Sequence, residues 1–135
     1  MLRLEFTQAH TYPNDEDGVT LPVVLRSGAS QVDVVASIDT GASFCLFAAE
    51  IAERLGIDLR SGERKRFRTA NSSLETFGHE VEITTTGVVT HSMVYFFADP
   101  LMIKNVLGRV GWLDRVQFGL IDHDSTIYLA PYDQS

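Results

Sequence analysis

The residues best suited to chemistry lie in one short turn, where Asp39-Thr40-Gly41 follows Ile38 and precedes Ala42 and Ser43. A carboxylate at such a turn can act as an acid or a base, and Gly41 would let the backbone approach it closely. The same carboxylate can instead cap the local backbone, as Asp does in an Asx turn between two strands. The three-residue pattern is expected by chance in roughly a few per cent of chains of this length. The elements around the turn therefore decide between these interpretations.

The segment before the turn predicts a tight β-hairpin that ends at Asp39. Residues 19–25 predict its first strand, in which Pro22 indicates an edge or irregular position. Residues 27–30 (Ser-Gly-Ala-Ser) predict the connecting turn. The second strand is indicated by apolar residues at every other position, namely Val32, Val34, Ala36 and Ile38. Such a hairpin would present Asp39 at the end of its second strand.

Beyond the turn, the pattern predicts a strand over residues 44–47, a short helix and then further strands. The helix is indicated by apolar residues at helical spacing and by a terminal glycine, namely Ala48, Ala49, Ile51, Ala52, Leu55 and Gly56. Further strands are predicted over residues 2–6, 67–70, 74–84, 88–98, 118–121 and 126–129, with an acidic turn at residues 14–18 and a helical turn over residues 110–115. The expected fold is mostly β, with one or two short helices in a single domain of residues 1–135.

A second motif, Asn105-Val106-Leu107-Gly108-Arg109, places apolar residues and a glycine before the predicted helical turn. Together with Asp39-Thr40-Gly41 it resembles the retropepsin-like family of aspartic peptidases, which includes retroviral proteases and single-domain bacterial relatives. The resemblance extends from about residue 21 to residue 129 and follows the family's order of elements. It implies an acid-protease barrel, with Leu107-Gly108 beside the catalytic turn and a flap hairpin at residues 67–75.

The resemblance also implies an active site made by two chains. Amide hydrolysis of this kind needs two carboxylates that share one proton, of which one activates water and the other protonates the carbonyl oxygen. A chain with one Asp-Thr-Gly supplies one carboxylate, so the implied enzyme is a symmetric homodimer with an Asp39–Asp39 dyad that cleaves a peptide or protein substrate. Thr40 would hydrogen bond across the two-fold axis, and Gly41 would permit the tight turn. The residues expected to contact substrate are Ala42, Thr69, Ala70, Asn71 and Leu107.

The predicted flap departs from the retroviral form, whose tip is rich in glycine. Residues 70–73 contain no glycine, although Asn71 can adopt the left-handed conformation that some tight turns require. An alternative function is therefore a catalytically inactive retropepsin-like module that binds a peptide or mediates dimerisation. The intact Asp39-Thr40-Gly41 favours the peptidase.

Other residues with reactive or metal-binding side chains make weaker cases. Cys45 has no basic neighbour in sequence, so we expect a buried strand residue rather than a nucleophile. Ser43 and the four scattered histidines lack the Gly-x-Ser-x-Gly motif of a serine hydrolase. The segment Asp122-His123-Asp124 has metal-binding side chains but is more typical of a solvated turn. We expect neither a metal nor an organic cofactor.

A basic cluster near the predicted flap consists of Arg60, Arg64, Lys65, Arg66 and Arg68. It is interpreted either as the exposed base of the hairpin or as a surface that favours acidic substrates or an acidic partner segment. By resemblance, Arg109 is expected to form an ion pair near the dimer interface. Trp112 and Leu113 are expected to pack the short helix that contains them against the core.

Composition argues against several other classes of protein. A chain of 135 residues with 44% hydrophobic residues can bury a core and is not typical of disorder. A net charge of −7 disfavours a nucleic-acid partner, which requires a basic face. No run approaches the ~20 apolar residues that cross a bilayer, and the start lacks a signal-peptide pattern, so no membrane partner is expected. The single cysteine excludes an intramolecular disulfide, and the expected location is the reducing cytoplasm.

Ala42 predicts the pH range of the reaction. In pepsin-like relatives a Ser or Thr at this position donates a hydrogen bond that favours the ionised carboxylate. Because Ala42 has no such donor, peptide cleavage should be fastest at mildly acidic to near-neutral pH. A pH–rate profile measures this, and an optimum at strongly acidic pH would contradict it.

Overall fold

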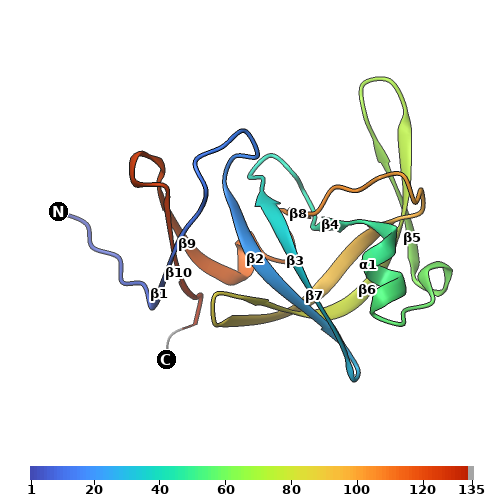
Figure 1. Ribbon diagram of the computed structural model, residues 1–135, viewed down its shortest axis with the longest axis horizontal. Coiled ribbons are helices and arrows are strands. Elements are labelled where there is room, and N and C mark those ends of the chain that lie inside the picture. The colour runs from blue at the N-terminus through green and yellow to red at the C-terminus, as the bar shows by residue number, and fades with distance from the viewer. Residues whose placement is uncertain (134–135) are drawn as a thin grey trace.

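The computed structural model describes residues 1–133 and contains two β-sheets and one short α-helix (Figure 1). In that range the larger sheet has seven strands in the order β2-β3-β8-β4-β7-β6-β5, and the smaller has three in the order β1-β10-β9. The strands are β1 (Gln8–Thr11), β2 (Thr20–Ser27), β3 (Ser30–Ile38), β4 (Leu46–Phe47), β5 (Glu63–Arg68), β6 (Ser73–Thr85), β7 (Val88–Phe97), β8 (Val106–Leu107), β9 (Val116–Ile121) and β10 (Thr126–Pro131). The helices are α1 (Ala49–Arg54) and the 3-10 helices η1 (Leu59–Ser61), η2 (Leu113–Arg115) and η3 (Asp122–Asp124). The expected mostly β class is confirmed.

The β2–β3 hairpin forms where the alternating apolar pattern predicts it. Every residue of β2 pairs with a residue of β3, and Gly28 in the connecting turn has a left-handed φ of +57°. At Pro22, β2 pairs with β3 on one side, and its pairing with β6 on the other side begins only at Val23. A strand with one neighbour leaves half of its N–H groups outside the ladder, so a proline is tolerated there.

The hydrophobic core receives side chains from both sheets and from α1. The apolar run at residues 94–97 forms the end of β7, where Val94 and Phe96 are 0% exposed, as predicted for a buried strand. Other fully buried large side chains are Trp112, Phe47, Phe97, Leu21, Leu25, Ile83, Leu107, Ile127 and Leu129. The core thus joins the β2–β3 hairpin to the C-terminal strands.

The predicted helix is present as α1, which contacts β3 and β7. It buries Ile51 and Ala52, and the buried Leu55 follows its last residue. Gly56 ends it with a left-handed φ of +72° and donates its N–H to the Glu53 carbonyl at 3.0 Å. No helix in the described part of the chain has the length and apolar character needed to cross a membrane.

Several element boundaries differ from those predicted, and β5 covers residues 63–68 instead of 67–70. Residues 2–6 form no strand, and Leu2 and Leu4 are 99% and 69% exposed, because the chain starts to pair with β10 only at Gln8. The strand expected over residues 44–47 is shortened to β4, while Phe44 makes an isolated bridge with Val110. The helical turn expected over residues 110–115 is confirmed only in its last part, as η2.

Trp112 should be a major contributor to stability, because it joins the segment after β8 to both sheets. Its side chain is 0% exposed, its Nε1–H donates to Thr85 Oγ1 at 3.2 Å, and its ring packs edge-on against Phe118. We expect Trp112→Phe to lower the free energy of unfolding by about 2–4 kcal/mol in urea denaturation, through a cavity and a lost buried hydrogen bond.

Val89→Ala is the matched control for Trp112→Phe. Val89 is 52% exposed on β7, so its truncation should change the free energy of unfolding by only about 0.5 kcal/mol. Equal losses of unfolding free energy in the two variants would contradict the claim that Trp112 contributes strongly to stability.

Candidate active site

Asp39 lies at the end of β3, where β8 supports it from the side. The two strands pair in parallel, with Ile38 opposite Leu107. One residue further on, the Asp39 N–H donates to the Leu107 carbonyl oxygen at 3.0 Å. The Ala42 N–H then donates to the Asp39 carbonyl oxygen at 3.1 Å and closes the turn. The Leu107 side chain is 0% exposed, so within one chain it supports the turn from the core, and its contact with substrate stays a prediction.

The Asp39 carboxylate is exposed and is only partly engaged by its own turn. The Gly41 N–H donates to Asp39 Oδ1 at 2.8 Å, which is the contact expected of an Asx turn. Among the residues that the structure describes, Oδ2 has no hydrogen-bond partner. Thr40 and Gly41 are exposed beside it. The carboxylate therefore has a defined orientation and one free oxygen, with which it can accept a proton or bind a water molecule.

Gly108 allows the segments before and after the turn to touch. A Cβ at this position would overlap the Phe44 carbonyl group and lie 2.8 Å from the Ala42 carbonyl oxygen. The next two N–H groups complete the contact, as Arg109 donates to Ala42 at 2.9 Å and Val110 donates to Ser43 at 2.8 Å. The residues that leave the turn are thus fixed by main-chain hydrogen bonds, as Asp39 is at its start.

A cavity of about 390 Å³ opens beside Asp39. Its walls include Val35 and Ser37 from β3 and Ile103 and Lys104 from the segment before β8. Val35 and Ile103 are 63% and 80% exposed and line the same cavity, so together they offer an apolar surface to a partner or a ligand. Sequence reasoning missed these lining residues. A signal was available in Val35, which lies out of phase with the apolar alternation of its strand.

The expected flap is present as the β5–β6 hairpin, which projects from the body of the molecule in Figure 1. Its tip closes on itself, because the Thr69 N–H donates to the Ser72 carbonyl at 2.8 Å and the Ser72 N–H donates to Thr69 Oγ1 at 3.0 Å. The Thr69 hydroxyl is thereby used within the hairpin. Ala70 and Asn71 are exposed at the tip, and their contact with substrate stays a prediction.

Asn71 does not adopt the left-handed conformation that is available to an asparagine in a tight turn. Among described non-glycine residues, positive φ values occur at Thr86 and Ser125. The hydroxyl of Thr69 provides the physical reason, because its hydrogen bonds close the four-residue connection without a left-handed residue.

Cys45 is a structural residue, as expected. Its side chain is 0% exposed, and burial raises the pKa of its thiol to about 11. The thiolate needed for nucleophilic attack is therefore scarce at neutral pH. Among described residues, no group of three or more His, Cys, Asp and Glu side chains could hold a metal ion. In the segment Asp122-His123-Asp124, the first carboxylate instead accepts a hydrogen bond from the Tyr12 hydroxyl.

Two arginines of the basic cluster at the flap, Arg60 and Arg64, form ion pairs. Arg60 and Arg64 both approach Glu75, at 3.6 Å and 3.4 Å, and both are more than half exposed. This agrees with an exposed hairpin base, where such pairs add little stability. Arg109 is exposed and makes no ion pair with the described residues of its own chain, so its pairing at a dimer interface stays a prediction.

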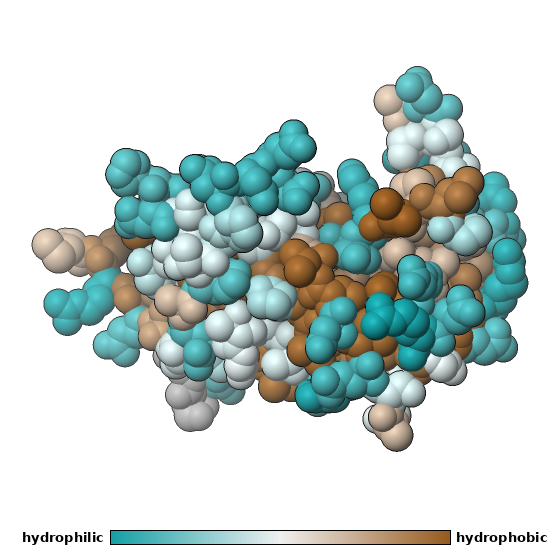
Figure 2. Space-filling model, viewed as in Figure 1, coloured by the Kyte–Doolittle hydropathy of each residue, from teal (hydrophilic) through white to brown (hydrophobic). Residues whose placement is uncertain are grey.

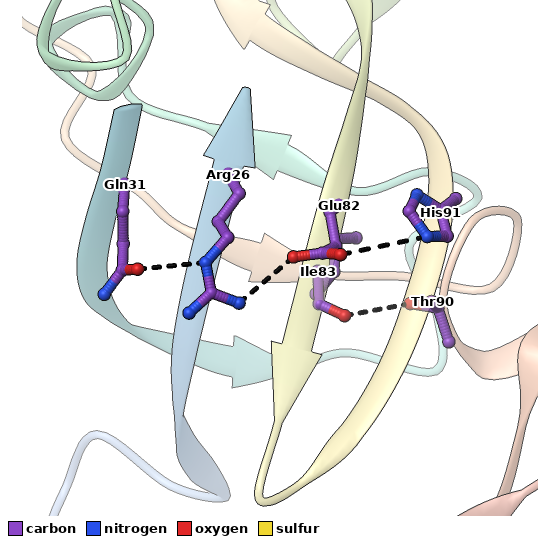
Figure 3. A network of polar contacts seen from close by, with 6 residues as sticks. All are labelled: Arg26, Gln31, Glu82, Ile83, Thr90 and His91. Carbon is purple, nitrogen blue, oxygen red and sulfur yellow. Dashed lines mark hydrogen bonds and ion pairs between the residues drawn. The ribbon is translucent and has the colours of Figure 1, made fainter. Parts of the chain in front are cut away.

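A second cavity, of about 400 Å³, lies away from Asp39. Arg26, Glu82 and His91 from its lining form a chain of contacts that Gln31 extends, so that the network spans four strands (Figure 3). Arg26 donates to Gln31 at 2.9 Å and to Glu82 at 3.1 Å, and Glu82 lies 3.9 Å from His91. We interpret this hollow as the surface of a sheet whose cross-strand pairs stabilise the register.

Comparison with known proteins assigns this site to a family. A family model described as aspartyl protease matches residues 18–110. The crystal structure of a retropepsin-like aspartic protease from Rickettsia conorii aligns with a TM-score of 0.65 and 22% identity, over 92% of this chain and 99% of that one. The EIAV protease, in complex with the inhibitor HBY-793, aligns with a TM-score of 0.55 and 20% identity, over 76% of this chain and 92% of that one. No curated protein matches the chain in sequence.

The chain therefore belongs to the aspartyl protease family whose model it matches, and its fold is similar to that of solved retropepsin-like proteases. Its fold is the mostly β fold with one short helix that the motifs around Asp39 and Gly108 predicted.

Gly108→Ala should damage the site through its backbone. Because the added Cβ would meet two main-chain carbonyl groups that cannot move aside, we expect a loss of about 1–3 kcal/mol in the free energy of unfolding, measured in urea. Gly41→Ala is the control, because its Cβ would meet only the exposed Asp39 carboxylate oxygen, at 3.2 Å. A comparable loss of stability in Gly41→Ala would contradict the account of Gly108.

Proposed function

We propose that the protein is an aspartic endopeptidase that hydrolyses peptide bonds with two Asp39 carboxylates, one from each chain of a homodimer. The observation that carries the proposal is the exposed Asp39 carboxylate, held by β8 in a turn whose surface is open. Membership of the aspartyl protease family supports the same chemistry.

The chemistry explains why one chain is not enough. An ionised carboxylate takes a proton from water as the water oxygen attacks the peptide carbonyl carbon. A protonated carboxyl group donates to the carbonyl oxygen, and a proton then passes to the leaving amine. Two carboxyl groups about 3 Å apart can share these tasks, because their mutual repulsion keeps one of them protonated. Each chain contributes one such carboxyl group.

The open surface of the turn supports a symmetric partner. In an isologous contact the same patch meets itself, so the exposed residues 39–41 of one chain would face those of the other. Thr40 is available to hydrogen bond across that contact. The cavity beside Asp39 and the β5–β6 flap would then bound a cleft for an extended peptide, with Val35 and Ile103 as apolar contacts.

A second candidate function is a retropepsin-like module that binds a peptide or mediates dimerisation without cleavage. Two observations favour it: the Asx-type bond from Gly41 to Asp39, and the closed tip of the flap at Thr69. The two functions differ in whether bound peptide is cut.

Asp39→Asn should abolish cleavage of a peptide library, with a loss of at least about 10³-fold in kcat/KM, because the amide cannot act as the base. The fold should be retained, because the main-chain bonds of Asp39 with Leu107 and Ala42 remain, and the side-chain oxygen of the new Asn can still accept from the Gly41 N–H. Asp33→Asn is the matched control, because Asp33 is an exposed carboxylate on β3, the strand that leads to Asp39, and this variant should cleave at the wild-type rate. Cleavage that survives Asp39→Asn would refute the dyad.

A further inference from the structure

The basic cluster at the flap is divided by the two faces of its hairpin. Residues directly opposite each other in an antiparallel pair share a face. Arg64, Arg66 and Arg68 are exposed and share a face with Phe77, Glu75 and Ser73. Lys65 and Phe67 are half-buried on the other face. Lys65 is therefore the cation of β5 that points toward the interior.

The ammonium group of Lys65 lies in a box of three aromatic rings. Its Nζ is 3.8 Å from the centroid of Phe44, 5.7 Å from that of Phe67 and 5.5 Å from that of Tyr95. The rings contact one another edge-on, with centroid separations of 5.3–5.7 Å. An ammonium within about 6 Å of a ring centroid is attracted by the ring's negative face.

The box fixes Lys65 more closely than a surface lysine is usually fixed. Among the described residues, Lys65 Nζ has no ion pair or hydrogen bond that would draw it away from the rings. Its backbone is also anchored, because the Thr76 hydroxyl donates to the Lys65 carbonyl at 2.8 Å. The cation and its strand are thus held at the same place.

Each wall of this Lys65 box comes from a different part of the site. Phe67 belongs to the flap strand β5, and Tyr95 belongs to β7 in the core. Phe44 follows the Asp39 turn, and its carbonyl is packed against Gly108. The shortest ring contact of Lys65 is therefore with the segment that leaves the catalytic turn. Through it the flap strand is tied directly to that turn.

We propose that Lys65 is a positioning residue, whose cation–π contact with Phe44 sets the position of the flap stem relative to the Asp39 turn. The inference rests on the proposed function, since a flap positioned over Asp39 matters most if substrate binds there. A looser flap stem would weaken the hold on substrate in the ground state and in the transition state alike, which raises KM and leaves kcat nearly unchanged.

Three variants separate the cation–π contact from other effects of substitution. Lys65→Met keeps the length and apolar stem of the side chain but removes the charge. Lys65→Arg keeps a cation that can lie over the same rings. Arg66→Met removes the neighbouring positive charge from the outer face of the same strand.

The first measurement is hydrogen exchange of the β5 amides that bond to β6, which requires no enzymatic activity. Lys65→Met should speed this exchange by about 2- to 30-fold, whereas Lys65→Arg and Arg66→Met should stay within about twofold of wild type. Unchanged exchange in Lys65→Met, or an equal increase in Arg66→Met, would show that the cation–π contact of Lys65 does not hold the flap stem.

The second measurement is peptide cleavage by the same variants. Lys65→Met should raise KM by about 2- to 30-fold, with kcat within about twofold of wild type. Lys65→Arg should have a KM close to that of wild type. A faster-exchanging β5 in Lys65→Met with unchanged KM would overturn the positioning role. If the wild-type protein itself cleaves no peptide, the proposed function fails, while the exchange data still decide whether Lys65 holds the flap stem.

Discussion

The parallel pairing of β3 with β8 is the constraint on which the rest of the site depends. It lasts for only two residue pairs, yet it is extended by the bond from Asp39 to Leu107 and by the bonds that return from Arg109 and Val110. Parallel strands need a long connection between them, and here that connection contains α1 and the β5–β6 and β6–β7 hairpins. Gly108 is the point where no side chain fits. Placement of Asp39 therefore requires most of the fold to be formed.

In the proposed homodimer each chain supplies half of the site. The carboxylate is oriented through one oxygen, and the turn around it is exposed together with Val35 and Ile103 of the neighbouring cavity. In the proposed dimer a second copy would cover this surface and supply the missing carboxyl group. The Asx bond from Gly41 is compatible with that role, because it uses one oxygen and leaves the other for water or for the second carboxyl group.

Much of the fold could be predicted because local patterns agree with tertiary contacts. The β2–β3 hairpin, α1 and the apolar end of β7 follow directly from period-two or helical spacing. The pattern at residues 2–6 was misleading, because alternation indicates a strand only where another strand is available to pair. The closure of the flap tip by the Thr69 hydroxyl could not be foreseen, since several residue types can close a four-residue turn.

The site was predicted less completely than the fold. Asp39 and its support by Leu107 and Gly108 were accessible because they form contiguous motifs. Ile103 and Lys104 were missed because a loop has no periodicity from which to infer its side-chain directions. The inward face of Lys65 depends on its register with β6, which single-sequence reasoning assigned only as a hairpin. Spatial partners of this kind are visible only once the strands are paired.

The claim that two chains share one catalytic centre is tested most directly by mixing wild-type and Asp39→Asn chains after joint refolding. If both carboxylates are needed, equal amounts of the two chains should retain about one quarter of the activity of the same total amount of wild type, because only wild-type pairs cleave. Retention of about one half would mean that each wild-type chain works by itself, and would contradict the account.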